Sequence, residues 1–371
     1  MRGREPEYSL LARQHEILVI GHHRGAKMIE SGVDPVSGVN FVFPGLKRVI
    51  AFDPVFVFRH RYECSSWVVF NGLKKILSDV DVIVTHELWP FFSAQSVRIA
   101  KSLGIPSAVI VFETIPRNFI FTYLLPYALN TKRVVAEANL FLPQTRRAKS
   151  YLGSCGVPET KLRIVYPGID LDLFKPASRV QDKNEIVVLF VGNFLQKGLP
   201  DLLEAFSKLA RECPNVVLWI VGDGPPDILA KVTILQRIHN IRYFGKVQHR
   251  ALADIYRQAD IYCQPGRDVM RFGIKTGEEQ FSYSLVEAMA SGLPIVTTDC
   301  GATREVVGKD NIVLQQQNVD GLTTALRTLV RDQELRKEIG ASNRKRAEQL
   351  FNREIQAKRF LDQICSLTSL R

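Results

Sequence analysis

The chain has 371 residues, 46% of them hydrophobic and 23% charged, and carries a formal net charge of +11 at pH 7. This composition excludes an intrinsically disordered chain, and the length predicts about two domains at roughly 100–200 residues each. No run of about 18 apolar residues occurs, so we expect no membrane-spanning helix.

Short apolar runs alternate with helical patterns along the whole chain. In the first half the predicted strands are 16–20, 80–85, 107–112 and 140–143, and the predicted helices are 92–103, 118–137 and 145–152. In the second half the predicted strands are 185–191, 216–221, 241–244, 261–264, 295–297 and 312–314, with helices that include 199–210, 251–258 and 283–291. This alternation predicts parallel, doubly wound α/β sheets.

A polar segment with prolines and a glycine divides the chain at about 166–184. It lies between two strand patterns, as a domain linker does. The sequence therefore predicts an N-terminal α/β domain over 1–168 and a C-terminal α/β domain over 177–350. The final helix, about 351–371, is expected to pack back on the N-terminal domain.

The first candidate binding turn follows the predicted strand 185–191. Gly192 and Asn193 begin it, and Lys197 ends it just before the next helix. Glycine lets backbone amides approach an anion closely, the helix start adds a partial positive charge, and the lysine adds a full one. The alternative is a plain turn with a solvated lysine.

A second turn, Gly222-Asp223-Gly224, follows the predicted strand 216–221. In open parallel sheets, ligands bind beyond the carboxyl ends of the strands, which is where this turn is expected to lie. The alternative is an ordinary strand-to-helix turn, in which Asp-Gly is common.

The strongest pattern is the segment 279–294, EQFSYSLVEAMASGLP. Glu279 precedes a predicted helix and Glu287 lies within its first turns, so the helix start between them offers amides to a phosphate. Carboxylates on either side can accept hydrogen bonds from sugar hydroxyls, one from a transferred sugar and one from a ribose. The alternatives are a capping box between Ser284 and Glu287, and a solvated loop acid at Glu279.

Taken together, in this order and spacing, these segments resemble glycosyltransferase family 4, also called glycosyl transferases group 1. The resemblance is dense over about 140–330 and includes a linker signature, VYPGID, at 165–170. It implies the GT-B architecture, in which two Rossmann-like doubly wound domains face each other across a cleft. It also implies that the C-terminal half binds a nucleotide-sugar donor.

The resemblance also implies roles for individual residues. Glu279 would contact hydroxyls of the donor sugar, Glu287 would contact the ribose, and Lys197 would contact the donor diphosphate. The implied donor-binding set is Gly192, Asn193, Lys197, Gly222, Asp223, Gly224, Glu279, Phe281, Ser282, Tyr283, Ser284 and Glu287.

Four departures from the family pattern stand out. The arginine that usually follows the first glycine of the phosphate turn is Asn193, and the family's Glu-Gly-Phe-Gly is EQFS at 279–282. The loop 266–277 is longer than usual and basic, so its cations are candidates to replace the missing arginine. The N-terminal residues resemble the family's first helix and second strand, so we expect the first strand to be missing or to precede Met1.

In the N-terminal half, His86 follows the predicted strand 80–85 and Glu113 follows the strand 107–112. The resemblance implies acceptor-side roles for both, and the alternatives are a structural histidine and an acid that caps the next helix. Two basic-aromatic stretches, 52–62 and 116–133, fit either contact with a membrane interface or helices packed in a core.

The resulting hypothesis is a retaining, metal-independent glycosyltransferase that moves a hexose from a UDP- or GDP-sugar to a hydroxyl of a glycan or lipid-linked acceptor. Glu279, Lys197 and His86 would carry catalysis, with no cofactor and no metal, because lysine and helix amides stabilise the diphosphate. The alternatives are a nucleotide-sugar epimerase on the same fold and a non-catalytic partner protein.

The expected partners are a nucleotide sugar and a glycan or glycolipid acceptor, and a basic surface also favours contact with an anionic membrane. No dense Lys/Arg block occurs, so nucleic acid is not an expected partner. Six cysteines without a CxxC pair, and a start without a signal-type apolar core, indicate a cytoplasmic protein or one peripheral to the cytoplasmic membrane face.

Overall fold

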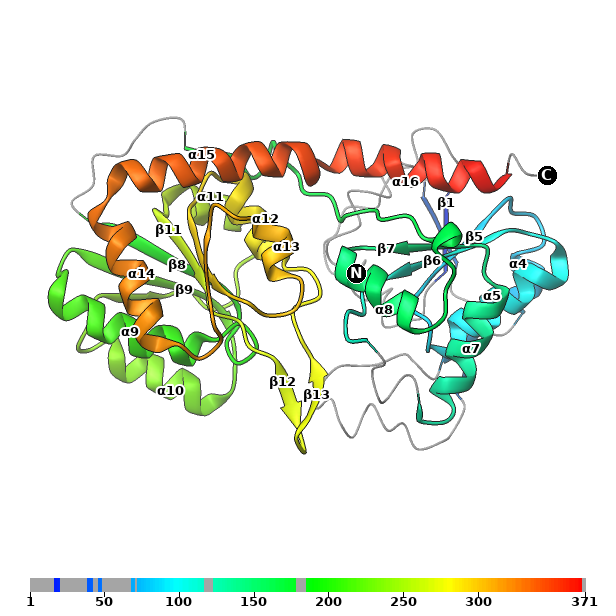
Figure 1. Cartoon of the computed structure of the whole chain (residues 1–371), viewed down its shortest axis with the longest axis horizontal. Coiled ribbons are helices and arrows are strands. Elements are labelled where there is room, and N and C mark those ends of the chain that lie inside the picture. The colour runs from blue at the N-terminus through cyan, green and yellow to red at the C-terminus, as the bar shows by residue number, and fades with distance from the viewer. Residues whose placement is uncertain are drawn as a thin grey trace. The chain divides into compact units, whose positions relative to one another are not determined.

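The computed structural model describes residues 17–20, 39–42, 46–48, 68–70, 72–116, 123–177 and 185–368. The chain forms two compact units, one of Met1–Gly168 with Glu354–Arg371 and one of Ile169–Arg353 (Figure 1). Each contains a parallel sheet with helices between its strands, which confirms the predicted α/β fold class. The residues before 17, where a missing first strand was predicted, lie outside the described part.

The second unit is built on a six-stranded parallel sheet in the order β10-β9-β8-β11-β14-β15. Its strands are β8 (Ile186–Asn193), β9 (Val216–Asp223), β10 (Ile241–Tyr243), β11 (Ile261–Gln264), β14 (Ile295–Thr298) and β15 (Ile312–Leu314). After β8, the chain adds β9 and β10 on one side of that strand. It then returns and adds β11, β14 and β15 on the other side. The strand order therefore reverses between β8 and β11.

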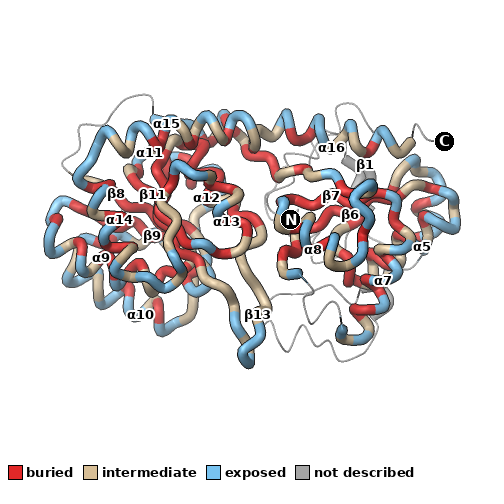
Figure 2. The backbone as a smooth tube through the Cα atoms, viewed as in Figure 1, coloured by how far each residue is buried: buried red, intermediate tan, exposed pale blue. Residues whose placement is uncertain are grey.

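Helices cover this sheet, and its inner strands β8, β9, β11 and β14 are largely buried (Figure 2). The helices are α9 (Leu199–Glu212), α10 (Pro226–Leu235), α11 (His249–Gln258), α12 (Tyr283–Ala290), α13 (Thr303–Val307), α14 (Val319–Arg331) and α15 (Gln333–Leu350). The loop expected over 266–277 is instead a two-stranded antiparallel hairpin, β12 (Val269–Arg271) and β13 (Ile274–Gly277).

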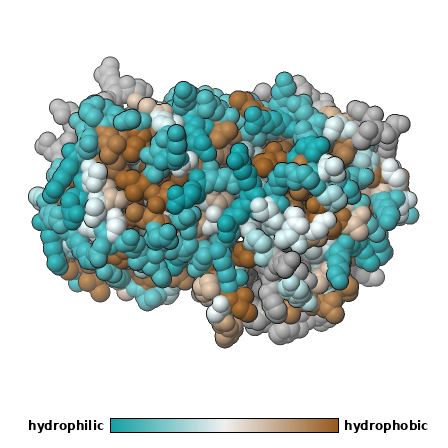
Figure 3. Space-filling model, in the orientation of Figure 1, coloured by the Kyte–Doolittle hydropathy of each residue, from teal (hydrophilic) through white to brown (hydrophobic). Residues whose placement is uncertain are grey.

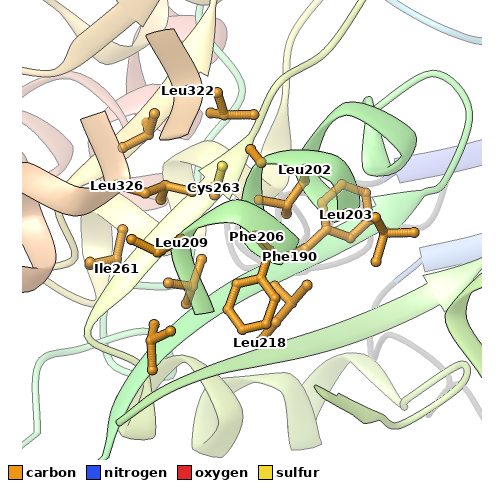
Figure 4. Packing of buried hydrophobic residues seen from close by; sticks show 14 of the residues in the cluster. Phe190, Leu202, Leu203, Phe206, Leu209, Leu218, Ile261, Cys263, Leu322 and Leu326 are labelled. Carbon is orange, nitrogen blue, oxygen red and sulfur yellow. The ribbon is translucent and has the colours of Figure 1, made fainter. Parts of the chain in front are cut away.

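The core of the second unit lies between α9, α14 and one face of the sheet. Leu202, Phe206 and Leu209 recur at helical spacing along α9 and are fully buried against Phe190 of β8 and Leu326 of α14 (Figure 4). Burying each such side chain contributes about 1.5–3 kcal/mol of transfer free energy. This packing fixes the positions of the strand ends.

The first unit contains a three-stranded parallel sheet, β5 (Ile83–His86), β6 (Ser107–Val111) and β7 (Leu140–Pro143), and two strand pairs. The pairs are β1 (Ile17–Ile20) with β2 (Val39–Val42), parallel, and β3 (Leu46–Arg48) with β4 (Val68–Phe70), antiparallel. The helices are α4 (Leu73–Ile76), α5 (Phe91–Leu103), α7 (Tyr127–Glu137), α8 (Arg146–Ser154), the short 3-10 turn Glu159–Lys161 and α16 (Arg353–Thr368).

Two helices of this unit bear on the sequence predictions. The helix predicted over 118–137 is α7, which begins only at Tyr127, and 117–122 lie outside the described residues. From α16, Ile364 packs against Ile110 and Leu142 of the sheet. None of the helices in the described ranges is both long enough and apolar enough to cross a bilayer.

The first two strands of the second unit approach so closely at their ends that a side chain would not fit. Gly192 ends β8 beside Gly222 of β9, and a Cβ on Gly222 would lie 2.0 Å from the Gly192 carbonyl oxygen. The Gly222 φ of 132° is also one that residues with side chains rarely adopt. Both strand ends therefore require glycine.

Replacing Gly222 by alanine is expected to lower the free energy of unfolding by about 3 kcal/mol or more, because a backbone clash adds to an unfavourable φ. The control is Gly245→Ala, where φ is 66° and a new Cβ meets nothing within 4 Å. That change should cost only about 1–2 kcal/mol. Denaturant unfolding measures both, and equal losses would contradict the importance of the close approach.

Candidate functional site

The candidate site lies beyond the carboxyl ends of β8 and β11 in the second unit. These strands are adjacent, but β8 continues into α9 and β9 on one side, whereas β11 continues into the hairpin, α12 and β14 on the other. A crevice forms where the order of parallel strands reverses, because the two connections leave in opposite directions. The loops after these two strands carry Lys197 and Glu279.

Lys197 and Glu279 meet although 82 residues separate them. The Lys197 ammonium forms an ion pair with the Glu279 carboxylate and lies 3.3 Å from the Ser282 hydroxyl. Both side chains are largely shielded, at 19% and 13% exposed. The lysine stem crosses Gly192, where a Cβ would lie 2.7 Å from its Cγ. The first glycine of the phosphate turn thus gives the lysine room to reach the glutamate.

Gln264, the last residue of β11, connects the groups around this ion pair. Its Nε2 donates to Glu279 Oε2 at 3.3 Å, and its Oε1 accepts from the hydroxyls of Ser282 at 3.0 Å and Ser284 at 2.8 Å. Tyr262 donates to the same oxygen at 3.1 Å. The sequence analysis missed Gln264, and the available signal was a polar residue ending an apolar strand.

The backbone of Glu279 is held as firmly as its side chain. Its carbonyl oxygen accepts a hydrogen bond from the Ala302 amide at 2.8 Å, in the turn after β14. A Cβ on Gly301 would lie 2.1 Å from that oxygen, and Gly301 has a φ of 56°. The loop before α12 is therefore fixed from the neighbouring strand.

The second glutamate of the motif, Glu287, is buried in α12 and bound at both carboxylate oxygens. His249 Nε2 lies 2.8 Å from Oε1, and the Tyr256 hydroxyl donates to Oε2 at 3.0 Å. The N-cap residue of α12 is Ser282, so Ser284 lies inside the helix and does not form a capping box with Glu287, which contradicts that alternative. Both partners lie on α11, and neither was identified from the sequence.

The Glu287 carboxylate perturbs the titration of His249. Its hydrogen bond raises the pKa of the imidazole, partial burial opposes that shift, and the charges of Glu287 and Asp170 add to the increase. The His249 ring also packs against Phe174, at 5.3 Å between ring centroids, which places part of the predicted linker segment 166–184 beside this site. Burial raises the pKa of Tyr256, which keeps its hydroxyl protonated as a donor to Glu287.

Several predicted donor-binding residues have local structural roles. Asn193 Oδ1 accepts from the amides of Leu195 and Gln196, both at 3.2 Å, so this side chain shapes the turn. Asp223 accepts from the Gly224 amide at 2.8 Å and pairs with Lys246 at 2.7 Å.

The residues at the start of α12 divide into two groups. Phe281 packs against the rings of Tyr283 and Phe351, which makes it part of the core. Ser282 is the N-cap residue, but its side chain makes no capping hydrogen bond. The hydroxyls of Ser282 and Ser284 instead donate to Gln264, and that of Ser282 also lies beside Lys197.

Two cations of the 266–277 segment, which were candidates to replace the missing arginine, form ion pairs within the second unit, and that replacement stays a prediction. Arg267 pairs with Asp201 at 3.1 Å. Lys275 pairs with Asp268 at 2.7 Å and with the fully buried side chain of Glu278 at 2.6 Å. Their charges are neutralised within the protein. The third cation, Arg271, lies in strand β12.

The two predicted acceptor-side residues lie at the carboxyl ends of adjacent strands in the first unit. His86 ends β5, and its carbonyl accepts from the Ser93 hydroxyl at 2.6 Å. Glu113 is buried beyond β6 and accepts from the amides of Thr114 and Ile115. The sequence analysis missed Glu87, which has a φ of 61° and accepts from the Phe112 amide at 2.9 Å.

Within the described ranges, no cluster of His, Cys, Asp and Glu is arranged to hold a metal.

Two family descriptions match almost the whole chain. Residues 9–173 match Glycosyltransferase Family 4, and residues 174–346 match Glycosyl transferases group 1. Among solved structures, Anabaena Alr3699/HepE in complex with UDP and glucose has a TM-score of 0.71 at 16% identity, over 98% of this chain and 96% of that one. Sucrose-phosphate synthase from Thermosynechococcus elongatus also scores 0.71 at 16% identity, over 99% and 93%. These likenesses show that the fold is GT-B.

Curated relatives align over shorter regions. The phosphatidyl-myo-inositol mannosyltransferase of Mycobacterium tuberculosis is 36% identical over 144 residues, or 38% of this chain and 35% of that protein. The MMP alpha-(1->4)-mannosyltransferase of Mycolicibacterium hassiacum is 31% identical over 231 residues, or 60% and 52%. Sulfoquinovosyl transferase SQD2 of Arabidopsis thaliana is 24% identical over 274 residues, or 68% and 50%. The chain thus spans about a third to a half of the length of these relatives.

Replacing Glu287 by glutamine is expected to lower the pKa of His249, because the hydrogen bond to the carboxylate is the main cause of the increase. NMR titration of labelled histidines measures it, with His249→Gln assigning the resonance among seven histidines. An unchanged pKa would mean that the His249–Glu287 contact is absent in solution.

The same contact makes stability depend on pH. Folded His249 holds its proton more tightly than the unfolded chain does, so the contribution is complete below the ordinary histidine pKa of about 6.5 and is lost as pH rises through the raised value. The His249 side chain is 56% exposed, so solvent screening keeps this contribution below about 1 kcal/mol.

Proposed function

Because this chain belongs to glycosyltransferase family 4, the glycosyl transferases group 1, we propose that it transfers a hexose from a UDP- or GDP-sugar to a hydroxyl of a glycan or lipid-linked acceptor. The observation that carries the proposal is the pairing of Lys197 with Glu279 at the point where the strand order reverses. A cation, a carboxylate and the start of α12 meet there, as binding of a diphosphate and a sugar requires.

Lys197 supplies the positive charge for the donor diphosphate. An ammonium group has three donors, and Glu279 and Ser282 account for two of its directions. The third is available to a phosphate oxygen. The amides at the start of α12 add partial positive charge, which stabilises an anion at a helix N-terminus. Both charges are held in place before the donor binds, so little reorganisation is needed as the diphosphate leaves.

Each of the two glutamates then has a hydroxyl-rich part of the donor to bind. Glu279 lies beside the lysine and would accept hydrogen bonds from the transferred sugar. Glu287 lies about one turn into α12, oriented by His249 and Tyr256, and would accept from the ribose. Each carboxylate oxygen has two lone pairs, so its existing partners leave acceptor capacity for ligand hydroxyls.

The proposed transfer retains the configuration at the anomeric carbon. The bond from that carbon to the diphosphate oxygen breaks and a bond to the acceptor oxygen forms on the same face. The acceptor's proton passes to an oxygen of the departing diphosphate, which takes the place of a protein base. Lys197 and the helix amides stabilise that leaving group, so the proposal includes no metal ion. His86, at the end of β5, is the proposed contact on the acceptor side.

The relatives guide the choice of substrates to test. Two of those named above are mannosyltransferases, and one of these acts on phosphatidyl-myo-inositol by its name. Mannose is therefore the first hexose to test and a lipid-linked hydroxyl the first acceptor. A lipid acceptor would place the protein at a membrane surface.

Replacing Lys197 or Glu279 by alanine is expected to reduce turnover by more than about tenfold each, because the charges they provide act on the developing diphosphate and sugar. The control is Lys208→Ala, which breaks an ion pair with Asp320 on α9 and α14. It should leave turnover unchanged. Circular dichroism and unfolding curves confirm that each variant folds, and wild-type rates in the first two would mean that the wrong residues were chosen.

The product of the reaction tests the chemistry itself. Incubation of labelled UDP- and GDP-sugars with a membrane extract should give a product whose anomeric configuration, by NMR, matches that of the donor. A chelator should not change the rate. An inverted product or a loss of activity with chelator would contradict the retaining, metal-free mechanism. A rearranged nucleotide sugar formed from donor alone would indicate an epimerase. If calorimetry detects no binding of UDP or GDP, the protein is a non-catalytic partner.

A further inference from the structure

The β12–β13 hairpin is inserted into the chain directly between two residues of the candidate site. It begins after Gln264 and Pro265 and ends just before Glu279. Figure 1 shows it as a two-stranded arm that extends beyond the six-stranded sheet of its own unit. In the same orientation, Figure 3 shows hydrophobic surface at this protrusion.

The end of the hairpin exposes apolar side chains. Phe272 is 91% exposed, Met270 is 55% exposed and Ile274 is 46% exposed. Met270 pairs across the strands with Lys275, and Arg271 pairs with Ile274. Paired residues lie on the same face of a two-stranded ribbon and consecutive residues on opposite faces, so Met270 and Ile274 lie on opposite faces. The tip is therefore apolar on both sides and at its end.

The turn itself holds Phe272 in an unfavourable conformation. Phe272 has a φ of 49° and Gly273 a φ of 74°, as in the two-residue hairpin turns that normally contain asparagine and glycine. A bulky aromatic residue is rare in this region. Phe272 therefore combines backbone strain with an exposed aromatic ring, two costs that an asparagine at this position would avoid.

The stem of the hairpin, in contrast, is fixed to the candidate site. Lys275 binds Asp268 and the buried Glu278, the residue directly before Glu279. The Thr276 hydroxyl donates to the Val269 carbonyl at 3.2 Å across the strands. The tip is thus joined to the loop of Glu279 by a short, ion-paired stem.

We propose that this tip, residues 270–274, inserts into the interfacial region of an anionic lipid bilayer. A protein groove would cover one face of the ribbon, whereas a membrane interface surrounds both faces and the end. Two residues of extended chain reach about 7 Å, which matches the roughly 5–10 Å depth of the headgroup and acyl boundary. Arg271 lies within the tip, 269–274 contains no acid, and the chain carries a net charge of +11, so an anionic surface attracts it.

Membrane insertion at the tip brings the loop of Glu279 to the lipid surface. The acceptor of the proposed transferase would then be lipid-linked, and this extension alone rests on the proposed function. Binding of the tip to lipid is independent of any catalytic activity, and the two are therefore measured separately.

The test compares the full chain with Phe272→Asn, in which asparagine suits the turn and removes the ring. Partition into vesicles of phosphatidylglycerol and phosphatidylcholine should fall by about tenfold, because one deeply inserted aromatic side chain is lost. The matched control, Ile238→Asn, replaces a 68% exposed apolar side chain elsewhere in the same unit. It should stay within about twofold of the wild type, as is usual for a surface substitution.

A second measurement locates the tip directly. Brominated lipids should quench the additional emission of Phe272→Trp in vesicles and should not quench that of Ile238→Trp. Equal partition of Phe272→Asn and the wild type, or no partition of the wild type, overturns the proposal. A wild-type dimer that becomes a monomer in Phe272→Asn also overturns it, because the tip would then bind a second copy. Calorimetry with UDP and GDP, expected to be unchanged in Phe272→Asn, tests the donor site independently.

Discussion

The constraint on which the site depends is the reversal of strand order between β8 and β11. Two loops that leave adjacent strands in opposite directions can only meet across the ends of those strands. Lys197 and Glu279 make this contact, and the backbone allows it because Gly192 lacks a side chain under the lysine stem. Gly301 likewise leaves room for the Glu279 carbonyl oxygen, because it has no side chain at that contact. The ion pair and the backbone contacts therefore define one geometry for the donor-side loops.

Charge is balanced locally around the Lys197–Glu279 pair. Arg267 and Lys275 are neutralised by acids of the same unit, and Asn193, where the family resemblance led us to expect arginine, closes a turn. The proposed diphosphate then depends on Lys197 and on helix amides more heavily than in a site with two cations. Tertiary contacts also fix the second glutamate, because His249 and Tyr256 hold both oxygens of Glu287.

The β12–β13 hairpin connects the loop of Glu279 to an exposed apolar tip. Its stem shares an ion-pair network with the residue next to Glu279, and its tip exposes Phe272 in a strained turn. A rigid stem and an apolar tip suit a contact that positions a site at a surface. The loop of Glu279 and the proposed membrane contact are thus parts of one continuous segment, 265–279.

The sequence alone determined the fold class and the elements of the second unit. Apolar periodicity located β8, β9, β11 and α12 to within a few residues, because a strand covered on both faces and an amphipathic helix must each show their own period. Motif spacing together with the family resemblance predicted that Lys197, Glu279 and Glu287 belong to one site, and the structure pairs the first two. Neither periodicity nor spacing indicated the β12–β13 hairpin, since a short exposed ribbon has no buried face to impose alternation.

Only the tertiary structure decided which residues surround those three. Gln264, His249 and Tyr256 are distant in sequence from the glutamates they bind, and no local pattern connects them. The same holds for the cations of the hairpin segment, whose partners Asp201 and Glu278 are defined by packing rather than by spacing. Local periodicity records which side of an element is buried, whereas the partner of a polar group depends on which elements the fold brings together.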